Sequence, residues 1–129
     1  MDYGFTVRTA TPFAEAVEQV RDALKSQGFG VLTEIDVQAT LLAKLGEQME
    51  DYLILGACNP PLAHRALSQD RQIGLLLPCN VVVRTQDGQT VIEALDPMTM
   101  VAVTGAEGLR PVATEAAARL RAALATVGS

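Results

Sequence analysis

Two cysteines and one histidine are the side chains best suited to chemistry in this chain of 129 residues. Cys58 immediately precedes Asn59-Pro60, a pair that predicts the start of a helix. At that position the helix dipole and free backbone amides stabilise a thiolate. The sequence therefore offers Cys58 as an activated thiol, with a small buried apolar side chain at a strand end as the alternative.

A metal site is a second chemical possibility. Cys79, like Cys58, lies at a junction between a strand and a loop, and His64 lies about one and a half turns into the helix predicted after Cys58. If Cys58, Cys79 and His64 met, with Glu34 or Asp36 beside them, the set would suit zinc or another thiophilic metal. The spacing matches no standard zinc pattern, and a solvated helix histidine is the alternative for His64.

Two carboxylates form a third candidate. Glu34 and Asp36 lie on either side of Ile35, at the end of a predicted strand, and at strand spacing both point to one face. Such a pair suits acid–base or cation-binding roles. A helix cap is the simpler role for Asp36, and Glu34 could equally form a salt bridge.

Polar residues at strand ends define a candidate ligand site. We expect them to cluster at one end of the sheet, where a polar group beside apolar strands would line a small-molecule pocket. Asparagines at such junctions also close turns or cap helices without any ligand. The predicted site consists of Glu34, Cys58, Asn59, Cys79 and Asn80.

Composition and charge limit the classes of molecule that we expect this chain to bind. The net charge of -5 opposes binding to phosphate backbones, and Lys and Arg form no cluster with interleaved aromatic residues. Apolar runs such as 73–77 and 81–83 are far shorter than the roughly 18 residues of a membrane span. The first residues lack the pattern of a signal peptide, and two cysteines are too few for a disulfide framework. We expect a cytoplasmic protein with no nucleic-acid or membrane partner.

The spacing of apolar residues predicts five strands and four helices. The predicted strands span 3–9, 30–35, 52–57, 81–85 and 90–95. Asp87-Gly88 favours an antiparallel hairpin between the last two strands. Thr11 is the expected cap of the first helix, which ends at Gly28, and Asp36 that of the second. The predicted helices span 13–27, 37–45, 60–67 and 111–127.

These elements predict a single α+β domain over 1–129. The order strand, helix, four strands and helix, with two short inserted helices, implies an antiparallel sheet with the long helices on one face. The other face then needs a cover. Because mean hydropathy is high for so small a chain, at +0.22, we expect a second subunit to supply it and form a homodimer.

Three segments resemble a known family. They are GFGVLTEID at 28–36, LGACNP at 55–60 and LPCNV at 77–81. In these motifs, and over nearly the whole chain, the sequence is similar to the bacterial and archaeal domain-of-unknown-function 302 family (DUF302). The resemblance implies a fold like that of the TATA-binding-protein class, which agrees with the element order above. It implies no reaction, cofactor or catalytic residue, and likeness to a DNA-binding fold carries no functional weight.

No phosphate-binding loop, nucleophile elbow or dinucleotide fingerprint is present in the sequence. The leading hypothesis is therefore a homodimeric accessory module that binds a small ligand or a partner. The alternative is a thiol-based redox or metal-dependent enzyme that uses Cys58 with Cys79. Neither hypothesis defines a cofactor.

Overall fold

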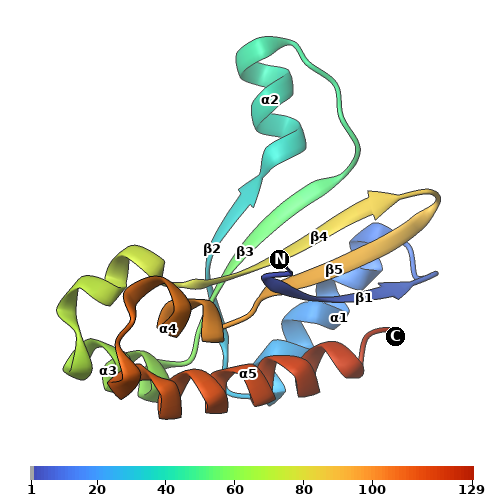
Figure 1. Ribbon diagram of the computed structural model, residues 1–129. Coiled ribbons are helices and arrows are strands. Elements are labelled where there is room, and N and C mark those ends of the chain that lie inside the picture. Colours follow the sequence, from blue (N-terminus) through green and yellow to red (C-terminus); the bar gives the residue numbers. More distant parts are fainter. Residues whose placement is uncertain (1) are drawn as a thin grey trace.

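The computed structural model describes residues 2–129 and contains one antiparallel sheet with its two long helices on one face (Figure 1). The strands lie in the order β1-β5-β4-β3-β2, and every neighbouring pair is antiparallel. The predicted α+β class and antiparallel sheet are therefore confirmed. The strands are β1 (Gly4–Thr9), β2 (Gly30–Asp36), β3 (Tyr52–Cys58), β4 (Cys79–Gln86) and β5 (Gln89–Leu95).

Five α-helices and two short 3₁₀ helices connect or follow the strands. The sequence prediction missed one of the α-helices, α4, whose sequence MTMVAVT is rich in β-branched residues that favour strands over helices. It also missed both 3₁₀ helices, Arg71–Leu76 and Glu107–Leu109. The α-helices are α1 (Phe13–Ser26), α2 (Val37–Leu45), α3 (Pro60–Gln69), α4 (Met98–Thr104) and α5 (Arg110–Ala125).

The predicted cap of α1 is wrong. Pro12 occupies the cap position, and no side chain accepts a hydrogen bond from the helix amides there. The Thr11 hydroxyl oxygen instead accepts a hydrogen bond from the Thr9 hydroxyl at 2.9 Å, which ties it to the end of β1. The fixed φ of Pro12 sets the entry into the helix without a side-chain cap.

The main core lies between the sheet and the pair α1 and α5. Leucine and valine side chains from both layers are almost fully buried there, which removes one sheet face from water. A second cluster joins α3, α4 and the start of α5 at the end of the sheet where β4 begins. The main core includes Val20, Leu24, Leu55, Val81, Ile92 and Leu120.

A projecting segment, the arm, leaves this body at the edge of the sheet. We define the arm as residues 32–50, which comprise β2 from Leu32 onward, α2 and the chain leading to β3. The pairing register of β2 shifts between Val31 and Thr33, so Leu32 forms a bulge, and bulges bend a strand and increase its twist. Figure 1 shows the arm rising from the sheet away from the other helices. Helix α2 has no buried residue.

No helix within residues 2–129 combines the length and apolar character needed to cross a bilayer.

Candidate functional site

Both cysteines line one apolar pocket at the end of β3 and the start of β4. Asn59, Leu62 and Met100 are also among its lining residues, so the second core cluster forms its far wall. Its volume is about 30 Å³, which is room for about two water molecules. Small-molecule pockets usually measure about 300–1,000 Å³. In this conformation the cysteine pocket is too small for an organic ligand.

The two cysteines share this pocket without forming a cross-strand pair. Ala57 is directly opposite Cys79, and neighbouring residues such as Ala57 and Cys58 leave a regular strand on opposite faces. Both cysteines are free thiols; Cys58 is half-buried and Cys79 is buried. Burial, and secondarily the nearby Cys58, raises the pKa of Cys79 to about 11. Cys79 is therefore a neutral thiol at physiological pH.

The helix that follows Cys58 has few donors left to activate a thiolate. Its first two residues, Pro60 and Pro61, carry no backbone N–H. The next two amides are occupied: Leu62 N donates to the Asn59 side-chain oxygen at 3.3 Å, and Ala63 N donates to the Asn59 carbonyl at 2.8 Å. The predicted stabilisation of Cys58 by free amides is therefore wrong.

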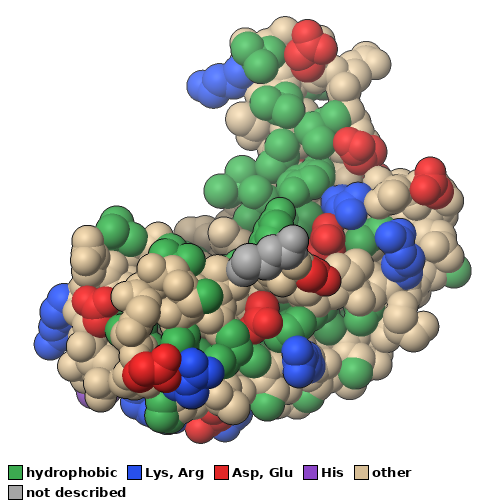
Figure 2. Space-filling model, in the orientation of Figure 1, with side chains coloured by type: hydrophobic (Ala, Val, Ile, Leu, Met, Phe, Trp, Pro, Cys, Tyr) green, Lys and Arg blue, Asp and Glu red, His purple; other side chains and the backbone are tan. Residues whose placement is uncertain are grey.

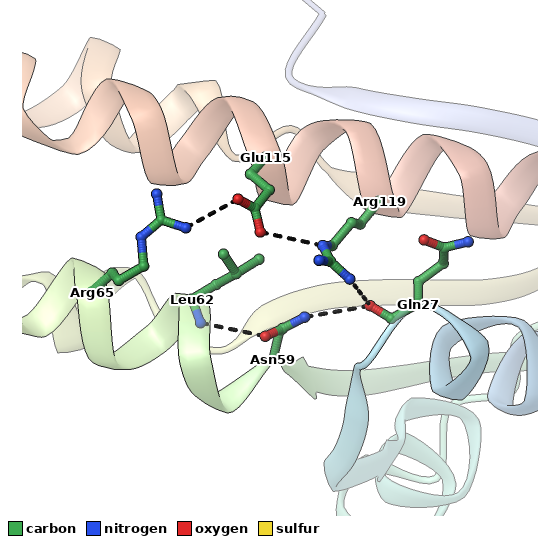
Figure 3. A network of polar contacts seen from close by, with 6 residues as sticks. All are labelled: Gln27, Asn59, Leu62, Arg65, Glu115 and Arg119. Atoms are coloured by element: carbon green, nitrogen blue, oxygen red, sulfur yellow. Dashed lines mark hydrogen bonds and ion pairs between the residues drawn. The ribbon is translucent and has the colours of Figure 1, made fainter.

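Asn59 is a structural junction in this region (Figure 3). It is only 7% exposed. Its side-chain oxygen caps α3, and its Nδ2 donates to the Gln27 carbonyl at 3.3 Å, just after α1. Arg119 of α5 donates to the same carbonyl at 3.2 Å. Asn59 therefore links the end of β3 to α3 and to the end of α1, and the shared Gln27 carbonyl extends this link to α5.

An ion-pair network continues from that junction. Glu115 of α5 lies 3.4 Å from the Arg119 guanidinium and accepts a hydrogen bond from Arg65 of α3 at 3.0 Å. These arginines lower the pKa of the Glu115 carboxyl, with the hydrogen bond from Arg65 as the largest cause. The side chains are exposed, so the network positions α3 against α5 and contributes little stability.

The two predicted carboxylates have separate structural partners. Glu34 is paired with Leu55 in the sheet, in the part of β2 that belongs to the arm, and its carboxylate forms an ion pair with Arg21 of α1. Asp36 caps α2 by accepting a hydrogen bond from Ala39 N at 2.9 Å, as predicted. Glu34 thus does not join the cysteines, and the acid–base pair is not formed.

Asn80 and His64 also lie outside the cysteine pocket. Asn80 follows buried Cys79 in β4 and is exposed, so it points to the open face of the sheet. His64 is exposed and lines a different surface hollow, with Ser68 and Pro111. The predicted metal set of Cys58, Cys79 and His64 is therefore not assembled. Within residues 2–129, no three His, Cys, Asp or Glu side chains are grouped to hold a metal ion.

A larger hollow lies on the open face of the sheet, opposite α1 and α5. Its volume is about 370 Å³, within the usual range for small ligands. Strand alternation contains the signal for this site, because Tyr52, Asn80 and Glu93 all point to one face. Of these residues, only Asn80 belongs to the ligand site predicted from the sequence. The lining residues are Asp2, Tyr3, Gly4, Tyr52, Asn80, Val82, Glu93, Ala94 and Leu95.

The polar groups at this hollow are ordered by neighbours on the same face. Arg84 Nε donates to the Glu93 carboxylate at 2.7 Å, and Arg84 Nη1 donates to Gln86 at 2.7 Å. The Thr6 hydroxyl also donates to Glu93, at 3.4 Å. Glu93 is therefore charge-compensated beside an apolar floor, and the hollow offers acceptors, an amide and aromatic rings in one place.

The buried Cys79 thiol predicts a pH-dependent stability. A thiol whose pKa is raised by folding favours the folded state below the unfolded pKa of about 9, and this contribution is lost as pH rises to about 11. The free energy of unfolding should fall by roughly 2–3 kcal/mol across that window. Urea unfolding of the wild type and of Cys79→Ala between pH 8 and pH 11 measures the difference. An equal pH dependence in both proteins would contradict the prediction.

The fold and the hollow define a small α+β domain with one sheet face packed by helices and one face open. The model of the family described as Domain of unknown function DUF302 matches residues 5–127, and the chain belongs to this family. The chain is similar to the crystal structure of an uncharacterized conserved DUF302 protein from Bacillus stearothermophilus, with 32% sequence identity and a TM-score of 0.91. That similarity covers 97% of this chain and 98% of the other. Among curated proteins, none matches this chain. The family resemblance predicted from the three motifs is confirmed.

Proposed function

We propose that the protein is a homodimeric module that binds a small organic ligand on the open face of its sheet. The observation that carries this proposal is the hollow of about 370 Å³ at Tyr52, Asn80 and Glu93. It combines an apolar floor with a few polar groups, which is the usual composition of a ligand site. The cysteine pocket, at about 30 Å³, is the weaker candidate.

The lining chemistry favours a flat, amphipathic ligand. Val82 and Leu95 offer aliphatic surface, and Tyr52 offers a ring for stacking. The Glu93 carboxylate and the Asn80 amide oxygen accept hydrogen bonds, so a ligand with an N–H or O–H on its edge is the best complement. The acidic net charge gives no reason to propose a nucleic-acid partner.

Thiol and metal chemistry have less support. Cys79 is a neutral buried thiol, the amides after Cys58 are already paired, and His64 lies in another hollow. We therefore place the function at the open sheet face and not at the cysteines.

Indole is a suitable probe, because it is planar, largely apolar and carries one N–H donor. In ¹H–¹⁵N spectra, titration with indole should shift the amides of Asn80, Val82 and Glu93. Val82→Arg, which fills the hollow, should weaken the binding at least tenfold. Val103→Arg is the matched control, since Val103 is 65% exposed on α4 and does not line the hollow. Shifts confined to other regions would refute the site.

A further inference from the structure

We infer that the arm is the dimerisation element: the arm of one copy packs across the open sheet face of a second copy, and the reverse contact forms by two-fold symmetry. This inference rests on the homodimer of the proposed function and names the surfaces that form it. It also predicts that the partner's arm lies over each hollow, so that a ligand bound there would be enclosed between the two copies.

The arm exposes apolar side chains that its own chain does not cover. Seven large apolar residues are strongly exposed within residues 2–129, and four of them lie on the arm. They are Leu32 (68% exposed), Ile35 (49%), Leu42 (52%) and Leu45 (68%). In Figure 2, hydrophobic side chains run from the tip of the arm down to the middle of the molecule. This continuity is the pattern of an interaction site, in contrast to singly scattered apolar residues.

Helix α2 needs packing that the single chain does not provide. It has nine residues and none is buried. Isolated helices of fewer than about 12–15 residues are marginal in water, because most helix stability comes from burial of an apolar face. The cap at Asp36 is a single hydrogen bond and does not replace this burial. A partner surface packed on α2 would supply the burial that its own chain leaves incomplete.

The solvent-exposed area of the chain is consistent with an uncovered interface of the usual size. The chain exposes 7200 Å², whereas a compact monomer of 13.7 kDa is expected to expose roughly 6,600 Å². The surplus of about 600 Å² approaches the roughly 800 Å² that each partner buries in a typical specific interface. The projecting arm is the feature of the fold that accounts for this surplus.

A second copy is the occupant that satisfies both surfaces at once. The chain carries a convex apolar arm and, beside it, a hollowed sheet face with Val82 and Leu95 on its floor. An isologous interface pairs each patch with its complement twice, so one two-fold axis covers two arms and two sheet faces. An unrelated partner would have to supply both complementary shapes itself.

The test is sedimentation velocity of the full chain at micromolar concentrations, without any ligand. The wild type should sediment as a dimer. The double variant Leu42→Asp/Leu45→Asp should raise the dissociation constant about 100-fold or more, because two buried apolar contacts become carboxylates. Both positions are exposed within one chain, so far-UV circular dichroism should still show a folded sheet.

Leu75→Asp/Val103→Asp is the matched control, because these side chains are 78% and 65% exposed but lie outside the arm. It adds the same charge and should leave the dimer intact. A monomeric wild type would overturn both this inference and the homodimer of the proposed function. A dimer that survives the arm substitutions, or that the control pair dissociates, would overturn the arm interface alone. Indole titration of the wild type, followed by the amide shifts of Asn80, Val82 and Glu93, tests the ligand site separately from these results on the dimer.

Discussion

Replacement of Asn59 by alanine should lower the free energy of unfolding by about 3 kcal/mol. The loss of an N-cap costs about 1–2 kcal/mol. Asn59 is also buried and donates to the Gln27 carbonyl, so the substitution leaves the Leu62 amide unpaired in an apolar site and removes a tie between α1 and α3. A buried unpaired polar group costs about 1–3 kcal/mol more. Urea denaturation at pH 7 measures the change.

Asp36→Ala is the matched comparison for that prediction. Asp36 caps α2 with the same side-chain-to-amide hydrogen bond, at 2.9 Å, but it is exposed and links no second helix. Its removal should cost no more than about 1 kcal/mol. Equal losses in the two variants would show that Asn59 acts only as a cap and not as a junction.

The sheet and its helices were predictable from local pattern, because burial imposes a period on each element. Alternation or a continuous apolar run indicated the strands, and the Asp87-Gly88 turn joins β4 to β5 in register, with Gln86 opposite Gln89. Helical spacing identified α1 and α5, whose buried stripes include Leu24 and Leu120. Helix α4 lacked such a signal, because its β-branched residues follow a proline and its packing depends on distant elements.

The candidate site was less predictable. The position of a residue at a strand end indicates the edge of the sheet at which it lies, but not the sheet face to which its side chain points. Cys58, Asn59 and Cys79 do come together at one end. Asn80, one residue after Cys79, points to the opposite face, so the same strand end contributes to two different pockets. Glu34 was misplaced because it lies in the arm, four residues beyond the pair Gly30–Cys58, and its carboxylate forms an ion pair with Arg21 of α1. Neither contact can be inferred from local spacing.

Prediction of the hollow on the open face would have required knowledge of the order of the strands in the sheet. Tyr3, Tyr52 and Glu93 are far apart in sequence, and they approach each other only because β5 and β4 lie between β1 and β3. Strand alternation predicts the face on which each side chain lies. It does not predict the order of the strands, and therefore does not predict that these side chains are neighbours. The exposure of the arm also could not be predicted from local sequence, because it depends on the absence of other elements packed against it.

Gly56→Ala is expected to destabilise the protein by about 3 kcal/mol, since overpacking typically costs 1–3 kcal/mol and occasionally more. Gly56 lies in the middle of the sheet, in β3, between Thr33 of β2 and Asn80 of β4. A Cβ at this position would lie 2.1 Å from the Thr33 hydroxyl oxygen and 2.9 Å from Pro78 Cγ. Thr33 is β-branched and proline is cyclic, so their side chains have few conformations that make room for the added methyl group. Thermal and urea unfolding both measure this loss.

Gly30→Ala is the control for strand glycines in general, because the nearest atom to its Cβ would be the Cys58 carbonyl oxygen at 4.0 Å. It should be neutral or stabilising by less than about 1 kcal/mol. Thr33→Ala alone should change stability by no more than about 0.5 kcal/mol, because Thr33 is exposed. Combined with Gly56→Ala it should recover about half of the loss, leaving the contact with Pro78. A Gly56→Ala protein as stable as Gly30→Ala would contradict the prediction and show that the neighbours of Gly56 move apart without cost. A double variant that recovers no stability would show that Thr33 is not the obstructing side chain.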